Sequence, residues 1–501
     1  MSNTGAVIKS IKNIMRKDRG VDGNAQRLGQ LVWMFFLKIL DDREAELEVL
    51  EDDYKSPLPD RLRWRNWAAD PEGITGDELA DFVNNDLFPS LKDLPLQGPY
   101  GGKARVIRNV FEDSSNYMKR GTLIRQVINK VQEIDFNNTE DRHTFGAIYE
   151  ELLRELQNAK DSGEFYTPRA VTRFVVDRVA PKLEETVLDP ACGTGGFLTC
   201  AIDYKRSKYV RSPKDEEQLQ ASVHGIEVKP LPHLMCVTNM ILHGIDAPSQ
   251  IEYDNMLSRR AYVDYGEKDR VDVILINPPF GGTEEDGVEN QFPATYRTKE
   301  TASLFMALVL KLLKVGGRAA VVLPDGFLFA DGGVEQRLKS ELSDKCNLHT
   351  IVRLPKGVFN PYTGINTNIL FFTKKKAEEG GKPATEHVWF YEHPYPEGVK
   401  SYNKGKPMRC EEFATEIDWW GSEEDGYASR VETEQAWRVS LEDIKARNYN
   451  LDIKNPNTPE AEFHDPEELL DQYQSQQAEI QSLRDQLKTI LSDALSGANQ
   501  S

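Results

Sequence analysis

From about residue 163 onward, short apolar runs alternate with amphipathic segments that have helical spacing. This alternation is typical of strands joined by helical crossovers and predicts a doubly wound parallel sheet. The seven expected strands are residues 186–188, 223–227, 250–253, 271–276, 319–323, 349–354 and 369–373. The connection 355–368 is rich in Gly, Pro and Asn, which predicts that the last two strands form an antiparallel addition at the sheet edge. The expected fold class is therefore α/β, with a Rossmann-like seven-stranded core.

The segments on either side of this core have different patterns. Before it, apolar residues recur at helix spacing and predict an all-α domain over residues 1–158, interrupted by a loop at 57–71. The core with one additional strand at 387–392 makes a domain over 159–400, and 401–464 is an acidic, irregular extension. Residues 465–501 are polar and Gln-rich, with a thin apolar seam that predicts a coiled-coil-like helix for a partner. The alternative is an end helix packed on its own domain. The seam consists of Tyr473, Ile480, Leu483, Leu487, Ile490 and Ala494.

Composition excludes several classes of protein. No apolar run approaches the roughly 20 residues of a membrane span, and no secretory signal begins the chain, so a cytoplasmic location without membrane contact is expected. Five cysteines without CxxC pairs or nearby histidines argue against a disulfide framework and against a metal site.

The net charge of −19 makes unaided DNA binding difficult, because phosphate contacts supply most non-specific affinity. Either a partner holds the DNA or local basic patches do. Each candidate patch has the alternative of an ordinary solvated surface. The candidates are Lys103 with Arg105 and Arg108, Lys119 with Arg120, and residues 374–376.

The fourth predicted strand ends in Asn277, Pro278, Pro279 and Phe280. Such a strand delivers its last residues into the ligand crevice of an α/β sheet. An Asn side-chain oxygen and a Pro carbonyl there offer two acceptors to an exocyclic amino group, and Phe280 can stack on a planar base. A strand followed by a proline-rich turn is the alternative.

A glycine-rich loop, residues 189–197, follows the first strand and opens a helix. Glycines in this context let the backbone approach a ligand closely and turn tightly. Glu227 ends the next strand, where Rossmann folds bind ribose hydroxyls, so a sugar-bearing cofactor is expected.

These motifs together resemble the amino-methylating DNA methyltransferases that use S-adenosylmethionine. With the helical N-terminal region and the C-terminal coil, nearly the whole chain resembles the modification subunit of type I restriction–modification systems. By this resemblance Glu227 holds the cofactor ribose, and Asp254 with Asn255 lies near its adenine ring. Residues 163–168 correspond to an additional motif at the methionine end of the cofactor. The other residues implied to bind the cofactor are Glu164, Phe165, Tyr166, Thr167, Pro168, Asp189, Pro190, Gly193, Thr194, Gly195 and Gly196.

The resemblance implies methyl transfer to the N6 amino group of adenine in double-stranded DNA, with Asn277, Pro278, Pro279 and Phe280 as the catalytic clamp. A separate specificity subunit would select the site, with two modification subunits per specificity subunit, and a restriction and translocation subunit can accompany them. Residues 281–302 are polar and contain glycines, which favours a mobile lid, although an ordinary surface loop is an equal alternative.

Two other functions remain open. An Asn-Pro-Pro-aromatic clamp also serves methyltransferases that act on RNA or on a protein glutamine. A non-catalytic scaffold in a defence complex is the second alternative, which the intact clamp argues against.

Overall fold

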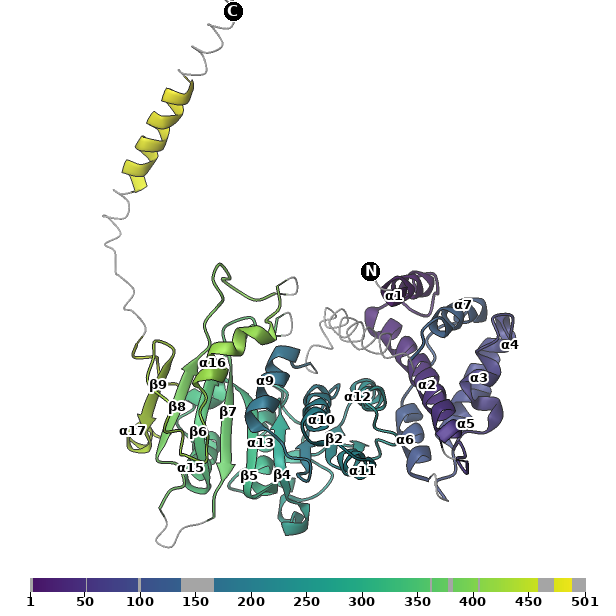
Figure 1. Cartoon of the computed structure of the whole chain (residues 1–501), viewed down its shortest axis with the longest axis horizontal. Coiled ribbons are helices and arrows are strands. Elements are labelled where there is room, and N and C mark those ends of the chain that lie inside the picture. Colours follow the sequence, from purple (N-terminus) through teal and green to yellow (C-terminus); the bar gives the residue numbers. More distant parts are fainter. Residues whose placement is uncertain are drawn as a thin grey trace, which may run out of the picture. The chain divides into compact units, whose positions relative to one another are not determined.

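The computed structural model describes residues 3–50, 52–97, 101–136, 166–360, 363–376, 382–403, 406–457 and 473–488 (Figure 1). Contacts divide the chain into two compact units, Met1–Asn455 and Pro456–Ser501. Among the described helices, none has both the length and the apolar character needed to cross a bilayer.

A nine-stranded sheet forms the centre of the first unit, in the order β3-β2-β1-β4-β5-β7-β6-β8-β9. Its strands are β1 Val187–Asp189, β2 Val223–Glu227, β3 Ile251–Tyr253, β4 Val271–Ile276, β5 Leu313–Pro324, β6 Cys346–Arg353, β7 Thr367–Lys374, β8 His387–Glu392 and β9 Ala436–Ser440. The first five strands in this order, β3, β2, β1, β4 and β5, pair in parallel. Strand β7 is antiparallel to both β5 and β6. The α/β class and all the predicted strands are confirmed.

Two details of the predicted sheet were wrong. The sheet has nine strands: the predicted additional strand at 387–392 is β8, which pairs in parallel with β6, and the unpredicted β9 pairs antiparallel with β8. The antiparallel strands β6 and β7 therefore lie inside the sheet and not at its edge. Strand β9 escaped the prediction because it is short and follows an acidic stretch without apolar alternation.

Both faces of the sheet are buried, which explains the short apolar runs in its strands. Along β4, Val273 and Leu275 belong to one buried cluster, while Ile274 and Ile276 belong to the other. The helices between the strands cover these faces, and Figure 1 shows them along the sheet. They are α9 Arg169–Val179, α10 Gly196–Tyr209, α11 Pro213–Gln220, α12 Pro230–Leu242, α13 Thr301–Leu312, α14 Asp325–Phe329 and α15 Gly333–Lys345.

The described N-terminal residues are helical, as predicted. The residues that gave the helical spacing, from Leu28 to Ile39 in α2, are all at most 3% exposed. The predicted loop 57–71 instead contains η1 and α3, because Trp64 and Trp67 are buried and fix this stretch against the helices. The elements are α1 Asn3–Met15, α2 Asn24–Leu50, η1 Asp60–Leu62, α3 Trp64–Trp67, α4 Gly76–Asp81, η2 Phe82–Leu87, α5 Phe88–Lys92, α6 Gly101–Glu112 and α7 Gly121–Gln132.

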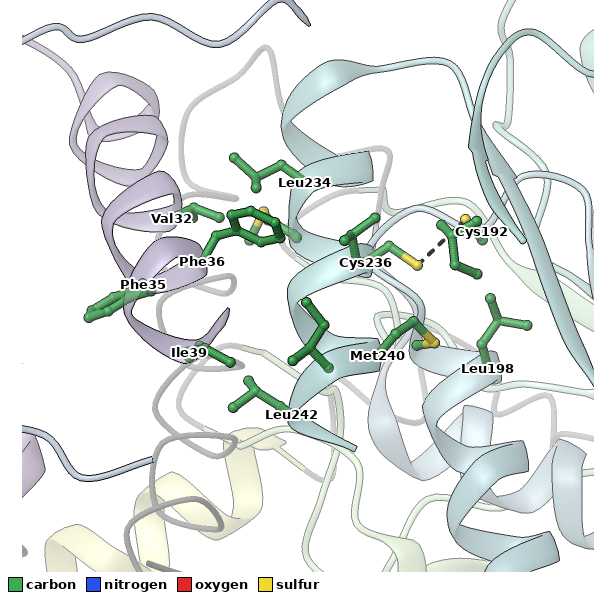
Figure 2. Packing of buried hydrophobic residues seen from close by; sticks show 14 of the residues in the cluster. Val32, Phe35, Phe36, Ile39, Cys192, Leu198, Leu234, Cys236, Met240 and Leu242 are labelled. Carbon is green, nitrogen blue, oxygen red and sulfur yellow. Dashed lines mark hydrogen bonds between the residues drawn. The ribbon is translucent and has the colours of Figure 1, made fainter. Parts of the chain in front are cut away.

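Helix α12 packs between the N-terminal helical region and the sheet region. Figure 2 shows Val32, Phe36 and Ile39 of α2 on one side of α12. On the other side of α12, Cys236 and Met240 face Cys192 and Leu198. The two regions therefore share one hydrophobic core.

Two polar contacts join the same regions. The Arg43 guanidinium of α2 forms an ion pair with Asp246 at 2.7 Å, and the Tyr253 hydroxyl donates to the Asp113 carboxylate at 2.6 Å. Asp113 follows α6 and Tyr253 ends β3, so the second contact lies next to the carboxyl end of the sheet.

The stretch predicted as an irregular acidic extension is ordered over most of its described length. It contains η7 Cys410–Phe413, α16 Ala414–Trp419, β9 and α17 Leu441–Ala446. Aromatic residues spaced between the acidic ones produce this order: Phe413 stacks on Phe174 of α9 at 4.2 Å between ring centroids, and Trp437 of β9 stacks on Phe390 at 5.3 Å. The sequence prediction relied on the acidic character of this stretch and therefore missed these aromatic contacts.

In the second unit, residues 473–488 form a helix whose residues are all exposed. Tyr473, Ile480, Leu483 and Leu487 of the predicted seam are between 44% and 60% exposed. Ile490 and Ala494 lie outside the described residues. The coiled-coil-like tail and its pairing with a partner stay a prediction.

Candidate active site

A cavity of about 510 Å³ lies at the carboxyl ends of the parallel strands β1 to β4. This is the place where ligands bind in open α/β sheets. The structure brings most of the predicted site residues together around it: Thr167, Asp189, Pro190, Gly193, Thr194, Gly196, Glu227, Asp254, Asn255, Asn277 and Pro279. Two residues of the predicted clamp, Asn277 and Pro279, therefore share one cavity with most of the predicted cofactor residues.

The glycine loop between β1 and α10 is held against α12. Gly193 and Gly195 have φ of +53° and +82°, a backbone conformation that glycine adopts without strain. A Cβ atom at Gly195 would lie 2.8 Å from the Cys236 sulfur, so the loop can approach α12 this closely only with glycine there. The Asn239 side-chain amide of α12 donates to the Thr194 carbonyl at 2.8 Å. Gly195 does not line the cavity itself but sets the position of the loop that does.

Two buried carboxyl groups face the loop. The Gly193 N–H donates to Glu227 Oε2 at 2.9 Å and the Lys229 N–H donates to Oε1 at 2.7 Å, which fixes the side chain. The Asp189 Oδ1 accepts from the Ala191 N–H at 3.1 Å. Burial raises the pKa of Glu227 and raises that of Asp189 well above its usual range. Each carboxyl group keeps oxygen lone pairs that can accept hydrogen bonds from ligand hydroxyls.

The turn after β3 forms another wall of the cavity. The Asn255 N–H donates to Asp254 Oδ1 at 2.8 Å, and Asn255 Oδ1 accepts from the Leu257 N–H at 2.9 Å. This local bonding holds Met256 and Leu257 as an apolar surface in the cavity wall. A flat heterocycle with polar edges fits such a wall.

Asn277 carries the most informative contact of the site. Its Nδ2 donates to the Thr167 hydroxyl oxygen at 3.0 Å. Its Oδ1 is buried and accepts no hydrogen bond from any residue that the structure describes. A buried acceptor without a partner costs about 1–3 kcal/mol, so this atom is prepared for a donor that arrives with a ligand.

Pro278 and the aromatic ring of Phe280 complete the predicted clamp. Pro278 is buried and Phe280 is half-buried, packed edge to face against Phe359 at 6.1 Å between ring centroids. Phe359 is 3% exposed and belongs to the hydrophobic core.

The other predicted site residues that the structure describes do not line the cavity: Tyr166, Pro168, Gly195, Pro278 and Phe280. Tyr166 packs against the larger buried cluster, and Pro168 caps the start of α9. Glu164 and Phe165 fall outside the described residues. The predicted lid 281–302 is held at both ends, since Thr283 bridges to Glu300 and the Thr301 hydroxyl donates to the Gly282 carbonyl at 3.0 Å. Phe292 is 3% exposed, so the middle of the segment is anchored as well.

Sequence reasoning missed part of the lining. Ile226 precedes the predicted Glu227 inside its strand, and Val228, Lys229 and residues 256–258 follow Glu227 or Asn255 within three residues, so a wider window around each predicted residue would have included them. Residues 282–285 and Thr301 belong to the predicted lid 281–302 but were not among the predicted site residues, and Phe305 carried no signal, because a loop and a helix start bring them back over the cavity. The missed residues are Ala191, Cys192, Phe197, Ile226, Val228, Lys229, Met256, Leu257, Ser258, Gly282, Thr283, Glu284, Glu285, Thr301 and Phe305.

Comparison with known proteins agrees with this geometry. The family model of the N-6 DNA methylases matches residues 140–465, and that of the HsdM N-terminal domain matches residues 4–131. The methylase subunit of the type I restriction enzyme EcoEI from Escherichia coli is 59% identical over 98% of both chains.

Two solved structures resemble the whole chain. A chain described as a modification subunit of a type I restriction enzyme from Vibrio vulnificus YJ016 is 44% identical, covers 92% of this chain and 98% of its own, and has a TM-score of 0.80. A structure concerned with assembly and conformational transition of the type I restriction–modification system is 34% identical, covers 98% of this chain and 99% of its own, and has a TM-score of 0.79. The chain therefore belongs to the N-6 DNA methylase family of adenine-specific DNA methyltransferases, as a methylase subunit of the type I restriction–modification class.

Proposed function

We propose that this chain transfers a methyl group from S-adenosylmethionine to the N6 amino group of adenine in double-stranded DNA. It would do so as the modification subunit of a complex whose separate specificity subunit selects the site. The observation that carries the proposal is the buried Asn277 Oδ1, which has no hydrogen-bond partner among the described residues and lies at the edge of a cavity that suits a nucleoside-bearing cofactor.

The residues present fit S-adenosylmethionine. The carboxyl oxygens of Glu227 are fixed by two backbone N–H groups and can accept from ribose hydroxyls. Met256 and Leu257 offer an apolar surface to the adenine ring, with Asp254 and Asn255 beside it. Thr167 would face the methionine end. Bound there, S-adenosylmethionine would supply a sulfonium methyl group as the electrophile.

The clamp residues account for the activation of adenine. The lone pair of the N6 amino group is delocalised into the ring, which makes the nitrogen a poor nucleophile. Hydrogen bonds donated by the two N–H groups to Asn277 Oδ1 and to the Pro278 carbonyl favour tetrahedral geometry at the nitrogen and localise its lone pair. The base must leave the duplex at a cost of a few kcal/mol, and Phe280 would stack on it. Transfer would then need mainly alignment: as the N–CH₃ bond forms, the S–CH₃ bond would break, and the methylated nitrogen would lose one proton to water without a general base.

The helical region offers a surface for the DNA backbone. The buried Asp18 carboxylate accepts from the backbone N–H groups of Lys119 at 3.0 Å and Arg120 at 2.9 Å, and also from Gly20 at 2.9 Å. It thereby joins the turn after α1 to the start of α7. Five exposed cations meet there, and none has a carboxylate within ion-pair distance among the residues described: Arg16, Lys17, Arg19, Lys119 and Arg120. We call these five residues the basic corner.

The other candidate patches are less available. In 374–376, Lys374 donates to the carbonyls of Leu310 and Leu313, and Lys375 pairs with Glu423. Lys103 lies over the Tyr54 ring and Arg108 donates to the Leu94 carbonyl. Their charges serve contacts inside the protein.

If the basic corner contacts phosphates, replacing both Lys119 and Arg120 by Gln should weaken DNA binding mainly at low salt. Each lost phosphate contact reduces the slope of log K against log salt by about 0.9, so we expect a reduction of roughly 2. Fluorescence anisotropy of the assembled complex over a salt series measures this slope. The double variant Lys375→Gln with Lys376→Gln removes the same charge elsewhere and should leave the slope unchanged. Equal slopes for both double variants would place the DNA on another surface.

The exposed C-terminal helix suits docking to the specificity subunit. Deleting Leu469–Ser501 should abolish co-purification with that subunit, because the deletion removes the apolar seam of 473–488 that would pack against it. Cofactor binding, measured by calorimetry, should remain, since the cavity lies wholly in the first unit. Continued co-purification of the truncated chain would show that assembly uses another surface.

Sequencing of host DNA with a method that reports modified adenines tests the proposed reaction. A host that carries this gene with its neighbours should show N6-methyladenine at a two-part site, and a host without the gene should not. Unmodified DNA in both hosts would contradict the proposal and favour an RNA or protein substrate, or a scaffold role.

A further inference from the structure

The polarity of the Asn277 amide decides whether the clamp can work. Its two ends have nearly the same shape, but only Oδ1 accepts hydrogen bonds. In the structure Nδ2 donates to the Thr167 hydroxyl at 3.0 Å and Oδ1 is left for the substrate. Rotation of the amide by half a turn would direct the NH₂ group at the amino group of adenine, so that two donors would face each other.

Thr167 alone does not fix this polarity. A hydroxyl group accepts as readily as it donates, so it can satisfy either end of the Asn277 amide. The hydroxyl becomes an obligatory acceptor for Nδ2 only when its own hydrogen is donated elsewhere. Among the described residues, the Asn277 amide is the single hydrogen-bond partner of this hydroxyl.

The position of Thr167 shows where that hydrogen can go. Thr167 lines the cavity together with Asn277, and its carbonyl lies 4.0 Å from where a Cβ of Gly196 would be. It therefore stands between the glycine loop and the clamp. A carboxylate at the amino-acid end of a cofactor would be a strong acceptor for the Thr167 hydroxyl.

Resting on the proposed function, we infer that Thr167 is a positioning residue that couples cofactor binding to the polarity of the clamp. When its hydroxyl hydrogen is donated to the cofactor carboxylate, its oxygen accepts only from Asn277 Nδ2. Asn277 Oδ1 is then held toward the target amino group. Without the cofactor the amide samples both orientations, and the clamp binds adenine less well. The cofactor thus prepares the site for the base before any methyl group moves.

Binding of the flipped base without chemistry tests the coupling. The probe is a duplex carrying the site found by sequencing, with 2-aminopurine next to the target adenine, whose fluorescence rises when that adenine leaves the stack. With the assembled wild-type complex, saturating S-adenosylhomocysteine should increase the flipped population several-fold, on the order of the fivefold effect of one hydrogen bond. 5′-Methylthioadenosine lacks the carboxylate and should give no increase.

The coupling can be removed by a change in the protein, at Thr167, or by a change in the DNA, at the target adenine. Thr167→Val keeps the shape and deletes the hydroxyl, so the increase with S-adenosylhomocysteine should vanish, while Thr167→Ser should keep it. Replacing the target adenine by purine deletes the amino group and should abolish the increase in the wild-type complex. Methyl transfer by Thr167→Val should fall in kcat more than in KM for DNA, and Thr167→Ser should restore it.

Several results would overturn the inference. One is a Thr167→Val complex that keeps the wild-type increase, and another is an equal increase with purine at the target. A Thr167→Val chain that binds no S-adenosylhomocysteine in calorimetry would assign Thr167 to cofactor affinity alone. Failure of the proposed function looks different, because wild-type protein would then leave the adenine unmethylated.

Discussion

Asn277→Ala should reduce methyl transfer to DNA by on the order of a thousandfold, as expected when a single preorganised group that stabilises a transition state is removed. The alanine deletes the buried Oδ1 acceptor and leaves the amino group of adenine with the Pro278 carbonyl alone. Initial rates with radiolabelled S-adenosylmethionine and duplex DNA measure the loss.

The matched control is Asn290→Ala, because Asn290 is exposed in the segment that follows the clamp. It should keep the wild-type rate. Cofactor affinity should change little in Asn277→Ala, since Glu227 and the glycine loop stay in place. A rate above a tenth of wild type in Asn277→Ala would show that the clamp oxygen is not the main source of activation.

Gly195→Ala should weaken cofactor binding by about a hundredfold, which corresponds to about 3 kcal/mol. The new Cβ would lie 2.8 Å from the Cys236 sulfur, and Gly195 has a φ of +82°, where a side chain costs roughly 1–2 kcal/mol. The loop can relieve the clash by moving away from α12 toward the cavity, and binding must then reverse that shift. Isothermal calorimetry with S-adenosylhomocysteine measures the change.

Gly316→Ala separates backbone strain from the clash. Gly316 has the same φ of +82°, but a Cβ there would have no atom within 4 Å. It lies near the start of β5, whereas the cavity lies at the carboxyl ends of the strands. Gly316→Ala should therefore lower thermal stability modestly and leave cofactor affinity intact. Equal losses of affinity in both variants would mean that strain, not contact with α12, explains the effect.

The sheet was predictable because burial on both faces leaves a simple mark in the sequence. The strands from Val187–Asp189 to His387–Glu392 contain short apolar stretches flanked by turn residues, and each was predicted, although β5 begins at Leu313, six residues before the predicted range 319–323. Strand β9 lacks this mark. Its order depends on Trp437 stacking on Phe390, a contact between residues far apart in the chain that no local pattern encodes.

The site was predictable where the chemistry lies at strand ends. Glu227 and Asn277 each come at or just after the last residue of a parallel strand, so their convergence follows from the topology. The contact between Thr167 and Asn277 spans 110 residues and depends on where α9 begins. Likewise, the closeness of Gly195 to Cys236 follows from how α12 packs, which spacing alone does not specify.

Helix α12 lines no part of the cavity, yet both of its sides are occupied. Cys236 and Met240 support the glycine loop, and Leu234 faces α2. Saturation mutagenesis should consequently find many positions in α12 where substitutions abolish activity, although this helix carries no motif and does not line the cavity. In this protein, residues that support the glycine loop from behind should be as sensitive to mutation as the residues of the active site.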